Sequence, residues 1–569
     1  MHTRGSPRRL ALLAAALLSA CAAGGAPARD RGLDGPNDQA VTGSFGAYLV
    51  GRFATAETDT RVAADSLLAA LRADPEQPEL LNRAFLATLL DGRSEAVRLA
   101  RRLPGSPAAN LLLADSDAQA GRWERAERRL RAMGRSGPVQ VLQPVLIAWV
   151  QLGGGHPDQA LATLRPLIES NRLRSLNALH AALIADLAGF PREAERFARL
   201  AVADQPNPPW RLAVLAAGVL HRAGQEEEAQ RLIEQIAERG DDAALAAAEA
   251  LKHDLLATRA IAAPTEGMAE AYAALAGALR GQGSGDFALI LAQLALRLRP
   301  GHVPSLVLAA EILGDQGHEE QALDMLGHVA TSEALAPVVA LRRAALLDKL
   351  GRVDEATAAL RELAAAYPDK PQPPARLGDL LRRHKRFAEA AAAYDEALSR
   401  VSNPDPRDWP LFYARGIARE RAGDWPQAEA DLKRALELSP EQPYVLNYLA
   451  YTWADQGRNL DRAKAMLLRA TELRPQDGNI ADSLGWVLFR IGDLKGAVEW
   501  LEKAVELEPR SSVINDHLGD AYWAVGRHRE ARFQWRRALV LEPEPGEGPK
   551  IEAKLRDGLA GYPASHAQR

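Results

Sequence analysis

The sequence is poor in cysteine and in aromatic residues, and each shortage excludes a class of protein. A single cysteine, Cys21, stands among 569 residues, so neither an internal disulfide nor a cysteine-rich metal site can form. Phe, Trp and Tyr together make up only 5% of the chain, whereas alanine, the strongest helix former, recurs throughout. The composition therefore favours closely packed helices over a disulfide-stapled or metal-centred fold.

Neither positive charge nor long hydrophobic runs are in excess. The 70 Lys and Arg residues are balanced by 74 Asp and Glu, so the chain lacks the basic surface with which proteins bind nucleic acid. Beyond the first twenty residues, no apolar stretch is long enough to cross a bilayer as a helix. We expect no nucleic-acid partner, and contact with a membrane only through a lipid anchor.

The N-terminus has the features of an export signal. Arginines up to position 9 precede a short apolar run over 10–18, which is typical of a secretory signal peptide. The run ends at Leu18-Ser19-Ala20-Cys21, which resembles a bacterial lipobox, where a lipidated cysteine becomes the mature N-terminus. We predict a lipoprotein signal peptide over 1–20 with lipidation of Cys21; the alternative is an ordinary signal peptide that happens to contain a cysteine.

The residue after the predicted lipidated cysteine indicates the membrane to which the protein is sorted. In lipoprotein sorting, an Asp directly after the cysteine retains a protein at the inner membrane, and here Ala22 follows. The resemblance thus implies the periplasmic face of a bacterial outer membrane. Residues 21–43 are rich in Ala, Gly, Asp and Pro and are predicted to form a flexible lipidated tether.

A period of 34 residues governs the remainder of the chain. It is clearest where Pro475, Pro509 and Pro543 follow one another at this spacing, each preceded by alanines five and twelve residues earlier. Leu-Gly pairs at 484–485 and 518–519 stand upstream, and a bulky residue lies between the alanines. This pattern resembles the tetratricopeptide repeat, a pair of antiparallel helices. In it, small residues let the two helices approach, and proline ends the second helix.

The repeat predicts an all-α fold, a tetratricopeptide superhelical solenoid of antiparallel helix pairs. Such an array avoids the size limit of a single core, because each unit packs on its neighbours. Extending the period gives units that begin near Ser44, Gln77, Pro107, Val141, Ser175, Trp210, Ala269, Val303, Pro337, Pro371, Trp409, Pro443, Gly478 and Ser512. We divide the chain into a degenerate N-terminal array (44–243), a helical joint (244–268), a C-terminal array (269–543), and a capping helix with a tail (544–569).

Motifs that carry catalysis are lacking. Glycine clusters at 153–155 and 281–285 have neither a preceding strand nor a following Lys-Ser/Thr, and both fall at predicted helix–helix turns. The 12 histidines show no metal-binding spacing, and no nucleophile elbow occurs. We predict no catalytic residue, no metal and no cofactor, and hence a protein that is not an enzyme.

The resemblance to tetratricopeptide arrays also implies a binding surface. In such arrays the first helix of each unit lines the concave side, through positions that are three or four residues apart. Transferred to the last three units, these positions give a candidate protein-binding groove of Asn447, Tyr451, Asp482, Trp486, Phe489, Asp516, Asp520 and Trp523. Aromatic rings beside carboxylates suit a peptide segment that carries Lys or Arg. The alternatives are tryptophans that pack between repeats, a solvated acidic face, or aspartates that act as acid and base.

Repeat and lipobox together resemble bacterial outer-membrane tetratricopeptide lipoproteins. Some members of that group are adaptors that tether a periplasmic carboxyl-terminal processing protease and present its substrates. The resemblance implies a scaffold for protein partners in the periplasm, attached to the membrane through its lipid only. Alternative functions are a subunit of an outer-membrane assembly or export machine, and a peptidoglycan- or glycan-binding protein, since Trp beside carboxylates also suits sugars.

Overall fold

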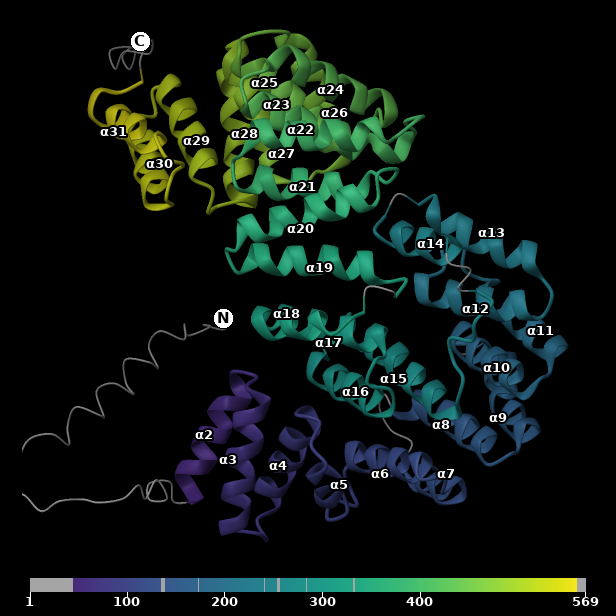
Figure 1. Cartoon of the computed structure of the whole chain (residues 1–569). Helices are drawn as coiled ribbons and strands as arrows, with labels where there is room; N and C mark the ends of the chain where they lie inside the picture. Colours follow the sequence, from purple (N-terminus) through teal and green to yellow (C-terminus); the bar gives the residue numbers. More distant parts are fainter. Residues whose placement is uncertain are drawn as a thin grey trace, which may run out of the picture. The chain divides into compact units, whose positions relative to one another are not determined.

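The computed structural model describes residues 44–134, 139–171, 173–239, 241–252, 256–282, 284–330 and 333–559. Cys21, the predicted signal peptide and the predicted tether lie outside these residues. In the described part of the chain every regular element is a helix, and Figure 1 shows most of them as antiparallel pairs. The predicted all-α class is confirmed. The chain divides into two compact units, one that ends at Ala84 and one that begins at Phe85.

The first unit is a helix hairpin followed by the start of a third helix. Its helices are α2 (Ser44–Ala56), α3 (Thr60–Ala73) and the beginning of α4 (Pro78–Leu90). The Asp59 carboxylate caps α3 by accepting a hydrogen bond from the Val62 amide at 3.0 Å. The hairpin helices touch at Gly51, where a Cβ atom would stand only 2.6 Å from Leu67 Cγ. A glycine is therefore required for this close approach.

The second unit opens with helix pairs in sequence order. These are α5 (Glu95–Ala100), α6 (Pro107–Gln119), α7 (Trp123–Ala132), α8 (Val139–Gly153), α9 (Pro157–Glu169), α10 (Arg174–Ala188), α11 (Pro191–Val202), α12 (Trp210–Arg222), α13 (Glu226–Ala237) and the single helix α14 (Ala243–Lys252). Within the pairs from α6 to α13 the even-numbered helix comes first. The joint expected over 244–268 contains most of α14 and the beginning of the next helix.

Further helix pairs and a final single helix complete the second unit. They are α15 (Pro264–Arg280), α16 (Gly285–Leu298), α17 (Val303–Asp315), α18 (Glu319–Gly327), α19 (Ala336–Lys349), α20 (Val353–Ala366), α21 (Gln372–Arg383), α22 (Phe387–Ser399), the 3-10 turn η2 (Pro406–Asp408), α23 (Trp409–Arg421), α24 (Trp425–Leu438), α25 (Pro443–Asp455), α26 (Leu460–Leu473), α27 (Gly478–Ile491), α28 (Leu494–Leu507), α29 (Ser512–Ala524), α30 (His528–Val540) and α31 (Glu547–Asp557). In this part the odd-numbered helix opens each pair. The unit expected near Ala269 begins earlier, at Pro264.

In each of the last two helix pairs, a small residue on the first helix lies against a bulky residue on the second helix. A Cβ atom at Gly485 would lie 2.6 Å from Leu501, and one at Gly519 would lie 2.4 Å from Trp535. Leu501 and Trp535 are themselves completely buried. The predicted role of the small residue, close approach of the two helices, is confirmed at both positions.

Helix α15 packs on helices that are distant from it in the sequence. It contacts α6, α8 and α10, which are all first helices of their pairs. The contact with α8 is made at Gly267, where a Cβ atom would be only 2.2 Å from the Trp149 ring. Nearby, the Tyr272 hydroxyl donates a hydrogen bond of 2.8 Å to the buried Asp115 carboxylate of α6. Burial raises the pKa of Asp115 well above its usual range, despite this hydrogen bond.

A buried ion pair fixes the same helix to α12. The Glu270 carboxylate accepts two hydrogen bonds from Arg211, at 2.6 and 3.0 Å, and lies 3.1 Å from His302. Burial opposes the charged form, but Arg211 and the hydrogen bonds hold the pKa of Glu270 well below its usual range. The first helices of the pairs from α6 to α13 thus each contact a helix of the same chain, α15.

The helices from α19 onward pack on α14 as well as on α18, which directly precedes them in the sequence. α14 contacts α19, and Leu245 belongs to the hydrophobic core that contains Leu341 and Leu377. An ion pair of 2.9 Å joins Asp242 to Arg376 of α21. In the sequence, the four helices α15–α18 therefore form an insertion between α14 and α19, and these two helices pack directly on each other (Figure 1).

Candidate partner-binding face

The candidate site lies on the first helices of the last units. α25 contacts α27, α27 contacts α29, and α31 reaches α29 through its side chains. We call the surface that these helices present the C-terminal face. It comprises the eight predicted residues together with Tyr444, Asn479, Val513, His517 and Lys554.

Four aromatic side chains and one carboxylate meet in the middle of this face. The His517 ring stacks on Trp486, with centroids 4.2 Å apart and planes inclined by 16°, and Phe489 stacks on Trp486 with centroids 5.3 Å apart. Tyr451 lies 6.4 Å from His517, measured between ring centroids. The Asp482 carboxylate is within 3.0 Å of His517 Nδ1. We refer to Tyr451, Asp482, Trp486, Phe489 and His517 as the aromatic cluster.

The charge of the aromatic cluster is set by the pair of His517 and Asp482. Both side chains are buried. Burial disfavours the charged imidazole, yet the carboxylate charge and the hydrogen bond of Asp482 outweigh it and raise the pKa of His517. The raised pKa favours an imidazolium that pairs with the Asp482 carboxylate.

The two remaining aspartates are already paired within the chain. Lys554 Nζ donates to Asp516 and to Asp520, each at 2.8 Å, and Trp535 Nε1 donates to Asp520 at 2.9 Å. Burial and the neighbouring Asp516 raise the pKa of Asp520 to about 6, although Lys554 acts in the opposite direction. Lys554 therefore occupies the place that a cationic partner side chain was expected to take.

Four of the predicted residues are buried, and Asp482 of the aromatic cluster is one of them. Trp523 is only 3% exposed and packs against Gly558, His528 and Trp535. Phe489 and Asp520 are likewise buried. For Trp523 the structure matches the alternative of a tryptophan that packs between helices.

Open parts of the C-terminal face lie around the aromatic cluster. Tyr444 is 42% and Val513 44% exposed, Asn479 is exposed, and Tyr451 and Trp486 are half-buried. Three buried polar atoms on this face have no hydrogen-bond partner among the described residues: Asn447 Oδ1, Trp486 Nε1 and Asp516 Oδ1. Unsatisfied buried groups are rare in native proteins, and either water or a bound partner would satisfy these atoms. Binding of a protein at this face stays a prediction.

Sequence reasoning missed His517 and Lys554. Lys554 lies 34 residues after Asp520, so continuing the repeat into the predicted cap would have placed the two on neighbouring helices. His517 stands next to Asp516, but nothing in the repeat pattern distinguishes an inward-facing histidine from a solvated one. Both residues change the charge of the face, because each neutralises a predicted carboxylate.

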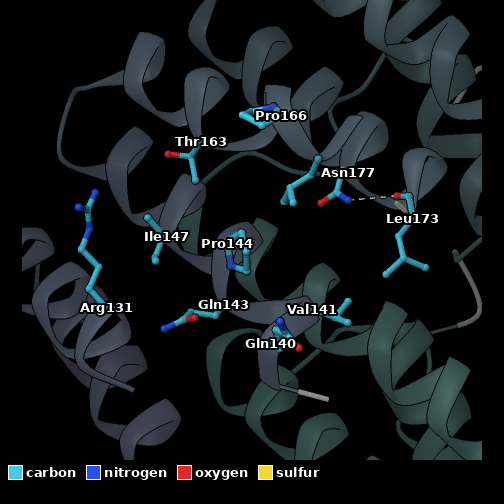
Figure 2. Close-up of a pocket in the computed structure, with 11 residues that line it drawn as sticks. Arg131, Gln140, Val141, Gln143, Pro144, Ile147, Thr163, Pro166, Leu173 and Asn177 are labelled. Carbon is cyan, nitrogen blue, oxygen red and sulfur yellow. Dashed lines mark hydrogen bonds between the residues drawn. The ribbon is translucent and has the colours of Figure 1, made fainter. Parts of the chain in front are cut away.

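A cavity of about 490 Å³ is a second candidate, and it lies between α8, α9 and α10. Figure 2 shows Pro144 and Pro166, which lie within α8 and α9, and also Asn177, which donates a hydrogen bond to the Leu173 carbonyl oxygen. Gln143 on its wall donates hydrogen bonds to the Leu130 and Met133 carbonyl oxygens. Its lining offers no charged pair for chemistry, so we consider the C-terminal face the stronger candidate.

The described residues contain neither a metal-binding group of side chains nor a membrane-spanning helix. None of their His, Cys, Asp and Glu side chains gather in threes as a metal site requires. No helix among them is long and apolar enough to span a bilayer.

Known proteins resemble the chain over its repeats. A model of the tetratricopeptide repeat matches residues 341–406, 413–459 and 458–512. A tetratricopeptide repeat-containing protein of Pseudomonas aeruginosa is 33% identical over 188 residues, which is 33% of this chain but only 31% of that relative. A solved tetratricopeptide repeat protein from Parabacteroides merdae is 16% identical over 44% of this chain and 96% of its own, with a TM-score of 0.37. YrrB, a tetratricopeptide protein described with an unusual peptide-binding site, is 20% identical over 31% of this chain and 89% of its own, with a TM-score of 0.27.

The paired, stacked helices define a helical-repeat protein. The family match and the relative go one step further: the part of the chain within 341–512 carries tetratricopeptide repeats. Proteins built from this repeat generally act as scaffolds for protein interactions.

Proposed function

We propose that this chain is a non-enzymatic adaptor lipoprotein of the bacterial envelope, which binds a periplasmic protein segment on its C-terminal face. The observation that carries the proposal is a difference between the first helices: some pack against another helix of the chain, and others present exposed side chains. Those of the pairs from α6 to α13 contact α15, whereas Tyr444, Asn479 and Val513 remain exposed beside the aromatic cluster. Exposed aromatic and apolar side chains around unsatisfied polar atoms suit a protein anchor.

The finer proposal is that the partner is a carboxyl-terminal processing protease or a substrate presented to it. It is supported by the resemblance of the lipobox and of the last three units to adaptor lipoproteins. The competing role, a subunit of an outer-membrane assembly or export machine, predicts a different captured partner. Binding of a glycan is disfavoured because His517 and Phe489 stack on Trp486 and take up ring surface that a sugar would need.

Site-specific crosslinking in the native envelope tests the binding face. A photoreactive amino acid at Asn479 on α27 should capture a discrete protein, which mass spectrometry then identifies. The matched control is the same group at Glu506, which is exposed on α28, the second helix of the same pair. Equal capture from both positions, or none from Asn479, would show that the C-terminal face is not the binding surface.

The anchor is tested separately by fractionation. Cys21→Ser should release the protein from the membrane, since two or more acyl chains hold a protein there effectively permanently. A wild-type protein that fractionates as soluble would contradict the anchor without bearing on the crosslinking result.

A further inference from the structure

The outward side of α2 carries an unusual concentration of apolar side chains. Phe45 is 70% exposed, Leu49 48%, Val50 44% and Phe53 69%. Phe45, Leu49 and Phe53 are four residues apart, so they form one stripe along the helix. We call these four residues the α2 stripe.

The inward side of the same helix is apolar as well. Ala47, Gly51 and Ala54 are buried, and Gly51 packs directly on Leu67 of α3. A helix that is apolar on all sides is normally enclosed. The only charged residue of α2 is Arg52, so solvation by charges does not explain the exposed stripe.

We propose that the α2 stripe lies in the surface of the lipid bilayer, which makes the first helix pair a second membrane contact beside the acylated Cys21. This proposal rests on the proposed lipid anchor. Only residues 22–44 separate Cys21 from Phe45, and a flexible chain of that length has an end-to-end distance of roughly 25 Å. The proposed anchor therefore keeps the stripe within reach of the membrane surface.

The tether also favours a bilayer over a second copy of the chain as the surface that the α2 stripe contacts. If a fully exposed Phe offers roughly 200 Å², the stripe presents about 400 Å² of apolar surface. A stable dimer buries about 800 Å² on each partner, so the stripe alone is too small. A weak contact with lipid is sufficient, however, because a short tether gives an effective concentration on the order of millimolar.

The predicted tether offers little that could cover the stripe, and the flanks of the stripe suit a membrane surface. Residues 22–43 contain no aromatic side chain, and Leu33 and Val41 are their only large apolar residues. Tyr48 and Arg52, with the guanidinium 5.9 Å from the ring centre, flank the stripe. Such residues place their polar ends at the level of lipid headgroups while the apolar residues enter the bilayer.

Fluorescence quenching in lipid vesicles tests the proposal on the full lipidated chain. Because the Cys21 thiol is consumed by lipidation, Leu49→Cys provides the single free thiol for a polarity-sensitive dye. In vesicles of phosphatidylethanolamine and phosphatidylglycerol, quenchers attached to the lipid chains should quench this dye several-fold more than a dye at Val540→Cys. Val540 is the control because it is 81% exposed on α30, near the other end of the sequence.

Equal quenching at the two positions in protein that floats with the vesicles would overturn the proposal and leave the anchor intact. Protein that does not float would overturn the anchor and the proposal together. A dye at Leu49 that becomes shielded only as protein concentration rises, and is not reached by the lipid quenchers, would assign the stripe to a second copy and also overturn the proposal.

Discussion

Backbone conformation at single turn residues decides where each helix pair reverses. In the pair of α19 and α20 the turn residue is Gly351, whose φ is 73°. One repeat further on, Lys385 takes the same conformation with φ of 59°. A side chain in this region costs about 1 kcal/mol or more relative to glycine.

Lys385→Gly should therefore stabilise the array, by about 1 kcal/mol. Its amide hydrogen bond to the Arg382 carbonyl involves the backbone alone and would survive the change. Urea unfolding followed by circular dichroism measures the gain. Gly351→Lys is the matched control and should lose a similar amount; a Lys385→Gly protein of unchanged or lower stability would show that the turn is not strained.

Two buried groups of the C-terminal face should make its stability depend on pH. The raised pKa of His517 stabilises the fold below the unfolded value, and this contribution is lost as pH rises through the folded value. For Asp520, whose pKa is raised to about 6, the folded state binds the proton more tightly than the unfolded state, so stability also falls as pH rises from about 4 to 6. Asp482, Asp516 and Lys554 are the charged neighbours of the two groups.

Raising pH from 5 to 8 should consequently lower the free energy of unfolding by about 1–3 kcal/mol. His517→Gln and Asp520→Asn should each flatten this dependence, which urea titrations at several pH values will show. His328→Gln, at an exposed histidine of the turn after α18, should leave the dependence unchanged. If His517→Gln and Asp520→Asn both keep the wild-type pH dependence, the two groups do not titrate as described.

At the scale of whole helices, docking of α15 on the N-terminal array includes one especially close contact. Gly267→Val would place side-chain atoms inside the Trp149 ring, which is completely buried. Overpacking of a core costs roughly 1–3 kcal/mol, and here α15 can instead detach. We expect faster hydrogen exchange in 264–280 and in α8.

The same helix supplies a matched control. A Cβ atom at Gly277 meets no atom within 4 Å, so Gly277→Val should leave both exchange and stability close to wild type. Fast exchange in both variants would mean that helix composition, rather than the contact with Trp149, governs the docking.

The helix pairs were predictable, but their long-range partners were not. The period located the units because small and bulky residues recur at fixed offsets, and helices begin at Pro107, Trp210 and Pro443 as expected. By contrast, the contact of Gly267 with Trp149 joins residues 118 positions apart, and no period encodes it. Likewise the repeat placed Asp516 on the C-terminal face, whereas its pairing with Lys554 depends on a helix beyond the last full repeat.

At the scale of the whole molecule, the C-terminal end of the array is closed by α31, and its closure competes with the proposed function. Ile551 is buried in the last core, and Lys554 forms ion pairs with Asp516 and Asp520. A partner that brings Lys or Arg to these carboxylates has to displace Lys554. A partner that binds only Tyr444, Asn479 and the aromatic cluster does not.

Lys554→Ala separates the two modes of binding. Loss of the ammonium leaves two largely buried carboxylates together, so we expect local destabilisation of about 1–3 kcal/mol and faster hydrogen exchange in 547–557. Exchange in α19–α24 should not change, because α25–α30 separate these helices from α31 in the stack. If the captured partner carries a cation to Asp516 and Asp520, its affinity for the variant should rise several-fold and become more sensitive to salt. Lys550→Ala, at an exposed lysine of the same helix paired with Glu547, is the control and should alter neither quantity. Unchanged affinity for Lys554→Ala would restrict the binding surface to the part of the C-terminal face around Trp486.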